Sequence, residues 1–344
     1  MSVYIILAIL AFSVLILSHE FGHFIMAKLN DVKVEEFSLG MGPKLFGVKG
    51  KETEYLIKAL PIGGYVKMLG EAMTGEEEVK TDDPRAFANK SAVRRLSIVA
   101  AGPIMNLILA ALVYVIIGYG QGFAVPEIAS FSDVSPAREE KLMVGDRILE
   151  VNNKKVTTWE DLSTEIITNK ENTVNLIVKR GSETLKFSIK PIKDEQEDRY
   201  IIGVVPAYNH SPSIGQSLSF GFKETKTWIN LTLSSFKQLF TGKASLGDVG
   251  GPVTIIRASG AAAQAGIWPL LSFMAFLSIN LAIFNIIPFP ALDGGWIFLC
   301  LFEIITRRKI DEKKVAVANY IGFTLLMILM VVVLIKDILF PIKL

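Results

Sequence analysis

The chain has 344 residues, of which 51% are hydrophobic and 20% are charged, and its mean hydropathy is +0.42. This composition is too apolar for an ordinary soluble protein and predicts several membrane-spanning helices. The formal net charge of +2 gives no indication of nucleic-acid binding, and the one cysteine, Cys300, excludes an intrachain disulfide and a thiolate cluster.

Four stretches are apolar over the roughly 20 residues that a helix needs to cross a bilayer. They are residues 3–27, 92–118, 267–287 and 315–335. The first has no basic segment before its apolar run and no small-residue cleavage site, so we expect a retained span and not a signal peptide.

The segment between the first two spans alternates between apolar and polar residues and is interrupted by glycine and proline. This pattern predicts three or four short strands or hairpins, at residues 34–39, 45–48, 54–60 and 64–68. The acidic stretch "GEEEVKTDD" that follows is expected to be a solvated loop.

A separate module is predicted over residues 121–207. It contains "VSPAREEKLMVGDRILEVNNKKVTTWEDL", which resembles a bacterial PDZ domain, although Glu140 and Asn153 stand where members of that family commonly have glycine. The alternative is a small unrelated β-domain. After it, residues 213–240 mix lysines and Glu224 with apolar residues, which predicts an amphipathic helix at the membrane interface.

The distribution of Lys and Arg predicts the orientation of the spans. Residues 28–95 hold 12 of these cations and the short loop 307–314 holds five, whereas the residues before the first span hold none. By the positive-inside rule, these two segments are cytoplasmic, and the N-terminus and the PDZ-like module are extracytoplasmic.

The first span contains the motif "HEFGH". On a helix, His19 and His23 are four residues apart and share one face, so both imidazoles can reach one metal ion. Glu20 beside them can accept a proton from water activated by that ion. The alternative is a group of polar residues at a helix end that reaches toward lipid headgroups.

A third metal ligand must come from elsewhere, because a catalytic zinc site usually has three protein ligands. His210 lies beyond the PDZ-like module and is expected to be a surface residue. Asp293, in "INLAIFNIIPFPALDGGW", is the better candidate, although a plain Asp-Gly turn is the alternative. Two crossings separate Asp293 from the histidines, which places them at the same cytoplasmic face only if residues 213–240 do not cross.

These motifs together carry a resemblance to a family. "HEFGH", "AGPIMN", "NIIPFPALDGG" and the PDZ-like insert are similar to the site-2 proteases of peptidase family M50, which are membrane-embedded zinc metalloproteases. The closest resemblance is to the branch that includes the bacterial regulator-of-sigma-E protease. Many members of that branch have two PDZ domains, and this chain has room for one.

The resemblance implies a role for individual residues. His19, His23 and Asp293 would bind Zn²⁺, and Glu20 would be the general base. Asn280 and Asn285 would bind substrate together with Pro288 and Pro290, although hydrogen bonding between helices is an equal alternative for the two asparagines. Residues 34–68 match the membrane-associated β-hairpins of the family, with Met41 replacing the usual aromatic residue in the "GMGP" loop. Asn106 matches a position with an expected structural role.

The expected fold is therefore an α-helical polytopic membrane protein with four transmembrane helices, membrane-associated β-hairpins and one inserted extracytoplasmic PDZ-like α+β domain. We predict the following segments: residues 1–30 (first span), 31–91 (hairpins and loop), 92–120 (second span), 121–207 (PDZ-like), 208–262 (interfacial helix and linker), 263–298 (third span) and 299–344 (loop and fourth span).

The expected function is intramembrane zinc endopeptidase in a bacterial cell membrane. Its partners would be the lipid bilayer and single-pass membrane proteins of the anti-sigma-factor or remnant-signal-peptide type, without nucleic acid. The alternatives are a membrane zinc amidohydrolase and a non-catalytic PDZ-bearing chaperone or scaffold. The amidohydrolase is disfavoured because PDZ-like modules engage polypeptides, and the scaffold because it has no use for Glu20.

Overall fold

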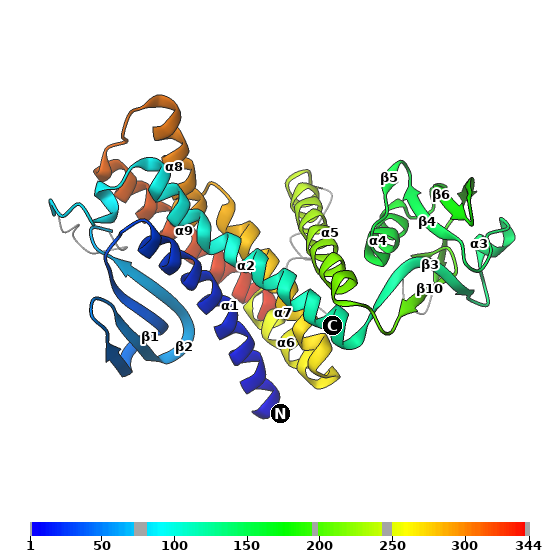
Figure 1. Ribbon diagram of the computed structural model, residues 1–344, viewed down its shortest axis with the longest axis horizontal. Helices are drawn as coiled ribbons and strands as arrows, with labels where there is room; N and C mark the ends of the chain where they lie inside the picture. The colour runs from blue at the N-terminus through cyan, green and yellow to red at the C-terminus, as the bar shows by residue number, and fades with distance from the viewer. Residues whose placement is uncertain (1, 72–80, 195–198, 243–249, 341–344) are drawn as a thin grey trace. The chain divides into compact units, whose positions relative to one another are not determined.

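A computed structural model of the chain describes residues 2–71, 81–194, 199–242 and 250–340. The chain divides into two compact units, which are residues 1–110 with 231–344 and residues 111–230. Two long helices, α2 (Ala92–Gln121) and α5 (Ile214–Phe240), each contribute to both units. Each unit is described by itself below (Figure 1).

Helices dominate the first unit. Besides parts of α2 and α5 it contains α1 (Ser2–Leu29), α6 (Pro252–Ala265), α7 (Ile267–Ile286), α8 (Asp293–Thr306) and α9 (Glu312–Leu339). Among the described residues, four helices are long and apolar enough to cross a membrane, namely α2, α7 and the larger parts of α1 and α9. The four stretches predicted from the sequence fall in these helices, and α5 is not among them.

A close approach of two backbones places α1 against α2. A Cβ atom built on Gly22 of α1 would lie only 2.3 Å from the carbonyl oxygen of Ala101 in α2. No side chain fits in that space, so glycine is required where the two helices meet. Gly22 is inside the "HEFGH" motif, and the motif is therefore held against the N-terminal third of α2.

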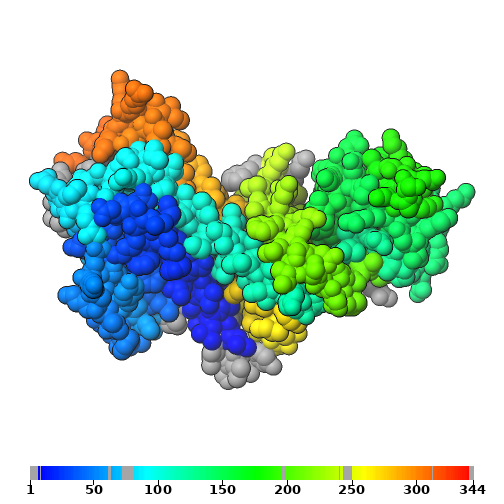
Figure 2. Space-filling view, in the orientation of Figure 1, coloured from blue at the N-terminus to red at the C-terminus, as the bar shows by residue number. Residues whose placement is uncertain are grey.

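A bent two-stranded antiparallel sheet lies beside α1 (Figure 1). In the space-filling view its blue surface lies next to that of α1 (Figure 2). The structure has two long strands, β1 (Val34–Lys49) and β2 (Glu54–Met68), where the sequence predicted three or four short ones. Residues 36–39 of β1 pair with residues 54–57 and also with residues 64–67 of β2. Gly40, Gly42 and Gly63 have φ of 87° to 88°, which explains how the strands bend without ending.

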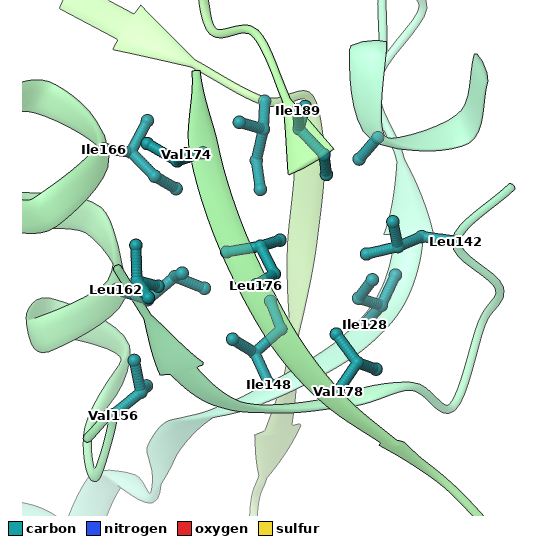
Figure 3. Packing of buried hydrophobic residues seen from close by; sticks show 13 residues of the cluster. Ile128, Leu142, Ile148, Val156, Leu162, Ile166, Val174, Leu176, Val178 and Ile189 are labelled. Carbon is teal, nitrogen blue, oxygen red and sulfur yellow. The ribbon is translucent and has the colours of Figure 1, made fainter. Parts of the chain in front are cut away.

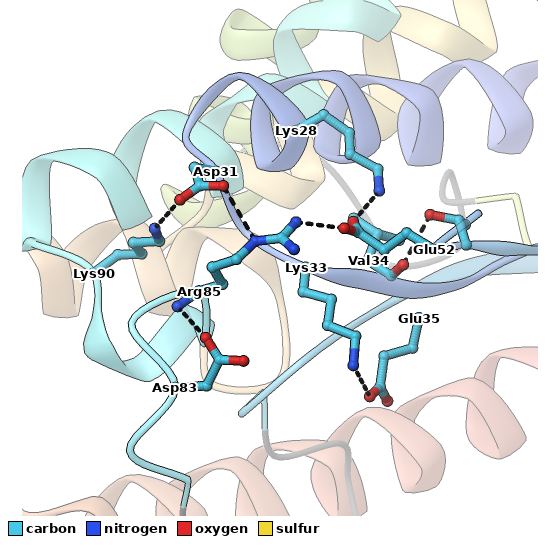
Figure 4. Close-up of polar contacts among 10 residues, drawn as sticks. Lys28, Asp31, Lys33, Val34, Glu35, Glu52, Asp83, Arg85 and Lys90 are labelled. Atoms are coloured by element: carbon cyan, nitrogen blue, oxygen red, sulfur yellow. Dashed lines mark hydrogen bonds and ion pairs between the residues drawn. The ribbon is translucent and has the colours of Figure 1, made fainter. Parts of the chain in front are cut away.

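This sheet exposes a set of large apolar side chains, which fits a membrane-associated hairpin. They are Met41, Leu45, Phe46, Val48 and Leu60. The turn between β1 and β2 is joined to the C-terminal end of α1 by ion pairs (Figure 4). Glu52 pairs with Lys28 and with Arg85, at 2.5 Å each, and Arg85 also pairs with Asp31 at 3.1 Å.

The PDZ-like module of the second unit has a six-stranded sheet in the order β10-β3-β4-β6-β7, with β5 paired to β4. Its strands are β3 (Phe123–Phe131), β4 (Arg147–Val151), β5 (Lys154–Lys155), β6 (Val174–Arg180), β7 (Glu183–Ile189) and β10 (Val204–Asn209). Strands β8 (Ile192–Asp194) and β9 (Arg199–Ile201) pair separately. Helices α3 (Pro136–Glu139) and α4 (Trp159–Asn169) complete the module, whose buried core is drawn in Figure 3.

Of the two departures from the PDZ glycine pattern, Glu140 needs no glycine and Asn153 has a conformation that glycine favours. Glu140 has φ of −82°, and the left-handed residue is its neighbour Lys141. Asn153 has φ of 64°, and asparagine tolerates this left-handed conformation better than most residues.

Within the second unit, α5 packs against both α2 and α4. A Cβ atom built on Gly221 would lie 2.7 Å from the Ala111 carbonyl oxygen, so α5 closely approaches α2. Glu224 is only 4% exposed and accepts a hydrogen bond from the Trp228 indole at 2.9 Å. Burial and then the nearby Glu160 carboxylate of α4 raise the pKa of Glu224 to about 9, and burial also raises the pKa of Glu160.

Candidate metal centre

Helix α1 presents His19 and His23 on one face, and both side chains are buried. The Nδ1 atom of His23 lies 2.9 Å from the carbonyl oxygen of Ile98 in α2. A carbonyl oxygen only accepts, so Nδ1 carries the hydrogen and Nε2 has the free lone pair. The Nε2 atom of His19 lies 3.2 Å from this nitrogen.

Asp293 begins α8, directly after the irregular segment that separates α8 from α7. Helix α7 ends at Ile286, and two prolines and the left-handed Ala291 (φ of 72°) keep the intervening residues out of a regular helix. A Cβ atom built on Gly294 would lie 1.9 Å from the Ile287 carbonyl oxygen, so only glycine permits this tight return.

The three predicted ligands converge. The Oδ2 atom of Asp293 lies 3.1 Å from His19 Nε2 and 3.5 Å from His23 Nε2, and among the described residues it has no hydrogen-bond partner. Four zinc ligands at about 2.0–2.1 Å in tetrahedral geometry lie about 3.3–3.4 Å from one another. The observed separations of 3.1–3.5 Å fit this edge length, so the three side chains fit a zinc ion with one ligand position left open.

Glycine in α2 leaves the room that the two imidazoles occupy. A Cβ atom built on Gly102 would lie 2.3 Å from His23 Nε2 and 2.8 Å from His19 Cε1. Any side chain at this position would displace the ligand atoms themselves. Gly102 was quoted in the sequence pattern "AGPIMN", but nothing in that pattern alone indicates that its hydrogen faces both histidines.

Glu20 lies where the sheet meets α1. A Cβ atom built on Gly64 of β2 would lie 3.2 Å from Glu20 Cγ, and the backbone of Val66 makes a hydrogen bond to the Glu20 carboxylate. A backbone N–H donates, so this bond requires Glu20 to act as the acceptor. The general-base candidate is therefore next to the predicted metal ligands and also next to one segment of β2.

Glu71 is a further carboxylate near this centre that the sequence interpretation missed. It follows β2, and one of its carboxylate oxygens is buried without a hydrogen-bond partner among the described residues. Burial, opposed by the nearby His23, raises the pKa of Glu71 to about 7. In the sequence, only the position of Glu71 close to the end of β2 could have indicated that it lies near this centre. Most of the acidic stretch "GEEEVKTDD", which was predicted to be a solvated loop, lies outside the described residues.

The other predicted residues have varied positions. Asn280 donates to the Phe276 carbonyl oxygen of its own helix at 2.8 Å, so no hydrogen bond of its side chain to another helix is seen among the described residues. Asn285 and Pro290 are partly exposed, Pro288 is exposed, and none of the three is brought into the cluster of His19, His23 and Asp293 that the structure describes. His210 is exposed on the second unit, as expected for a surface residue.

The fold and the site together define a class of protein. Two histidines four residues apart on an apolar helix, an aspartate from a second segment and an adjacent glutamate form the donor set of zinc hydrolases with the H-E-x-x-H motif. Because the histidines belong to a helix long enough to cross a bilayer, the class is a membrane-embedded zinc metalloprotease.

Comparison with known proteins identifies the family. The profile of peptidase family M50 matches residues 7–329, so the chain belongs to this family. A Clostridium acetobutylicum protein named as a candidate zinc metalloprotease is 53% identical over 339 residues, which cover 98% of both chains. The Bacillus subtilis regulator of sigma-W protease RasP is 30% identical over 412 residues, which cover 97% of this chain and 98% of RasP.

Among solved structures, the PDZ domain of the SdrC-like protein from Listeria monocytogenes is similar to part of the chain. It is 22% identical, covers 26% of this chain and 90% of its own, and gives a TM-score of 0.22. The family match and the two relatives show that the chain is a bacterial membrane protein of the site-2 protease family and a zinc metalloprotease that uses Zn²⁺.

Proposed function

We propose that this protein cuts peptide bonds within the transmembrane segments of single-pass membrane proteins. In this proposal His19, His23 and Asp293 hold the zinc ion, and Glu20 is the general base. The observation that carries it is the convergence of three acceptor atoms inside an apolar helix bundle, with Glu20 beside them. A cation at the centre of these three atoms would offset the cost of burying them.

The chemistry divides between the ion and the chain. When bound, zinc supplies a Lewis acid that makes water nucleophilic at neutral pH and polarises the carbonyl group under attack. Glu20 accepts the proton of the attacking water and passes it to the leaving nitrogen. The histidine that donates Nδ1–H to Ile98 keeps its Nε2 directed at the site.

A helical substrate must unwind before its peptide bond reaches Glu20, because the backbone groups of a helix are bonded to each other. The segment of β2 near Gly64 and Val66 supports a route for this step. It pairs on one side with residues 36–39 and approaches Glu20 on the other. An unwound substrate added along this segment would have its backbone groups paired in a water-poor setting.

Topology and substrate type are further parts of the proposal. The Lys and Arg distribution supports an active site toward the cytoplasmic face and an extracytoplasmic PDZ-like module over residues 121–207. That module would engage or screen the outer part of the substrate. The name of the Bacillus subtilis relative, a regulator of sigma-W, supports anti-sigma factors as substrates, and remnant signal peptides are the second candidate class.

Four residues around α7 and its C-terminal loop are proposed to contact the substrate backbone. They are Asn280, Asn285, Pro288 and Pro290. The support is that they directly precede Asp293 along the chain, and that Asn285 has no hydrogen bond among the described residues, which leaves its amide available.

The test uses purified full-length protein in detergent with a model single-pass substrate. Glu20→Gln is expected to retain zinc and lose cleavage, whereas Asp293→Ala is expected to lose both. His210→Ala is the matched control, because this exposed histidine should affect neither. Cleavage by Glu20→Gln at the wild-type rate would overturn the role of Glu20. If the protein binds zinc and hydrolyses a small amide but cleaves no membrane peptide, the amidohydrolase is favoured. If neither reaction occurs, the scaffold is favoured.

A further inference from the structure

Asn106 occupies a buried position next to one of the histidines. It belongs to α2, has no exposed surface, and its Nδ2 atom lies 3.4 Å from Nδ1 of His19. Its Oδ1 atom is buried and, among the described residues, has no hydrogen-bond partner. The Asn106 side chain is therefore in contact with His19 on the side opposite the predicted metal position.

The side chain of Asn106 is not needed to join the helices. Ser278 of α7 donates a hydrogen bond of 2.8 Å to the backbone carbonyl oxygen of Asn106. Any residue offers that carbonyl, so the contact between α2 and α7 gives no reason for an amide at this position. A buried polar side chain that lacks a partner costs about 1–3 kcal/mol, and some other interaction must offset this cost.

The missing interaction follows from what a metal ligand requires. A histidine that binds through Nε2 carries its hydrogen on Nδ1 and needs an acceptor there, as His23 has in the Ile98 carbonyl oxygen. Rotating the Asn106 amide by half a turn exchanges its nitrogen and oxygen, whose positions are assigned only from hydrogen bonding. After the rotation Oδ1 accepts from His19 Nδ1–H, and the unpaired acceptor disappears.

We infer that Asn106 is the positioning residue of His19: its Oδ1 accepts the Nδ1 hydrogen and so keeps the Nε2 lone pair directed at the metal. Three residues of α2 at intervals of four then serve the two histidines. Ile98 accepts from His23, Gly102 leaves space for both rings, and Asn106 accepts from His19. This inference rests on the proposed zinc ligation by His19.

The test measures zinc affinity of the full-length protein in detergent by competition with a chelator, and the visible absorption spectrum of the Co²⁺-loaded form. Asn106→Asp keeps an acceptor and removes the donor, whereas Asn106→Leu keeps a similar volume and removes both. We expect Asn106→Leu to bind zinc about 10–100-fold more weakly, as for other partners of metal-bound histidines, and Asn106→Asp to bind close to the wild type.

Ser278→Ala is the matched control, because it removes the neighbouring hydrogen bond without touching a histidine. It is expected to lower the unfolding temperature and leave zinc affinity and the Co²⁺ spectrum unchanged. Equal loss of affinity in Asn106→Asp and Asn106→Leu, or wild-type affinity in Asn106→Leu, would overturn the inference. If the wild type itself binds no zinc, the proposed function fails instead, so the two failures are distinguishable.

Discussion

Substitution of Gly102 by alanine adds one methyl group at the point where both histidines lie closest to α2. The added Cβ atom would lie 2.3 Å from His23 Nε2, 2.6 Å from His23 Cε1 and 2.8 Å from His19 Cε1. Since non-bonded carbon contacts are most favourable at about 3.5–4.0 Å, the His23 ring must retreat by about 1.2 Å or more. His23 is also bonded to Ile98 through Nδ1, so retreat requires the loss of that bond or a shift of α1.

The size of this displacement sets the expected effect. Metal ligands tolerate about 0.2 Å in distance, so a shift of about 1 Å removes His23 from the first coordination sphere. We expect Gly102→Ala to lower zinc affinity by about 100-fold or more, and kcat/KM by at least about 100-fold, because a 1 Å misplacement of reacting groups costs this much. Zinc competition titration and cleavage of the model substrate measure the two quantities.

Helix propensity acts in the opposite direction, which makes the prediction specific. Replacing glycine by alanine inside a helix stabilises it by up to about 1 kcal/mol when the methyl group has space. Gly260 of α6 is the matched control, since a Cβ atom built there meets nothing within 4 Å. Gly260→Ala is expected to keep zinc and activity and to unfold at the same or a higher temperature. Wild-type zinc affinity in Gly102→Ala would refute the proposed packing of the site against α2.

Three further predictions concern other parts of the chain. The folded chain raises the pKa of Glu224 to about 9, so Glu224 keeps its proton at neutral pH. The thermal stability of the second unit should therefore fall as pH rises from about 5 to about 9. In a series of melting curves, Glu224→Gln should remove most of this pH dependence. Asp146 is fully buried and accepts two hydrogen bonds of 2.7 Å from Arg180. Asp146→Ala should therefore destabilise the PDZ-like module by about 1–3 kcal/mol, seen as faster hydrogen exchange over residues 121–207. Val66→Pro removes the N–H directed at Glu20 and should lower kcat/KM about tenfold with zinc retained. The control Val48→Pro, at an exposed position of β1, should leave kcat/KM unchanged.

Each of these three has an outcome that contradicts it. A flat stability profile of the wild type between pH 5 and pH 9 would show that Glu224 is ionised in the folded chain. Unchanged exchange in Asp146→Ala would mean that its pair with Arg180 contributes no net stability. Full activity of Val66→Pro would exclude this segment of β2 as the place where the substrate strand adds.

The parts of the molecule that are specified by local sequence were predictable. The apolar stretches, the spacing of His19 and His23 and the PDZ-like pattern each depend on neighbours along the chain, and the structure has the corresponding helices and sheet. The joining of Asp293 to the histidines was predicted from the expected number of crossings, and the structure has the three side chains together. Whether these residues bind zinc remains a prediction that the metal and cleavage assays test.

Features that depend on how helices rotate against each other were not predictable from one sequence. The role of Gly102 and the contact between Asn106 and His19 require knowing which face of α2 meets α1. The long bent strands were divided into short ones in the prediction because glycine and proline were interpreted as strand ends. Glycines with positive φ instead let the strands continue through a bend.

The dependence of the site on α2 has a physical reason. A metal site needs its ligands fixed from outside as well as from their own backbone, and α1 alone cannot orient two imidazoles that are free to rotate about their side-chain torsions. Helix α2 restricts the rotation of both imidazoles, through a carbonyl acceptor at Ile98 and an amide at Asn106. It can do so only because Gly22 and Gly102 let α1 and α2 approach within van der Waals contact. A larger residue at either glycine is therefore expected to separate the acceptors from the histidines and to lower zinc affinity without altering any of the predicted ligands.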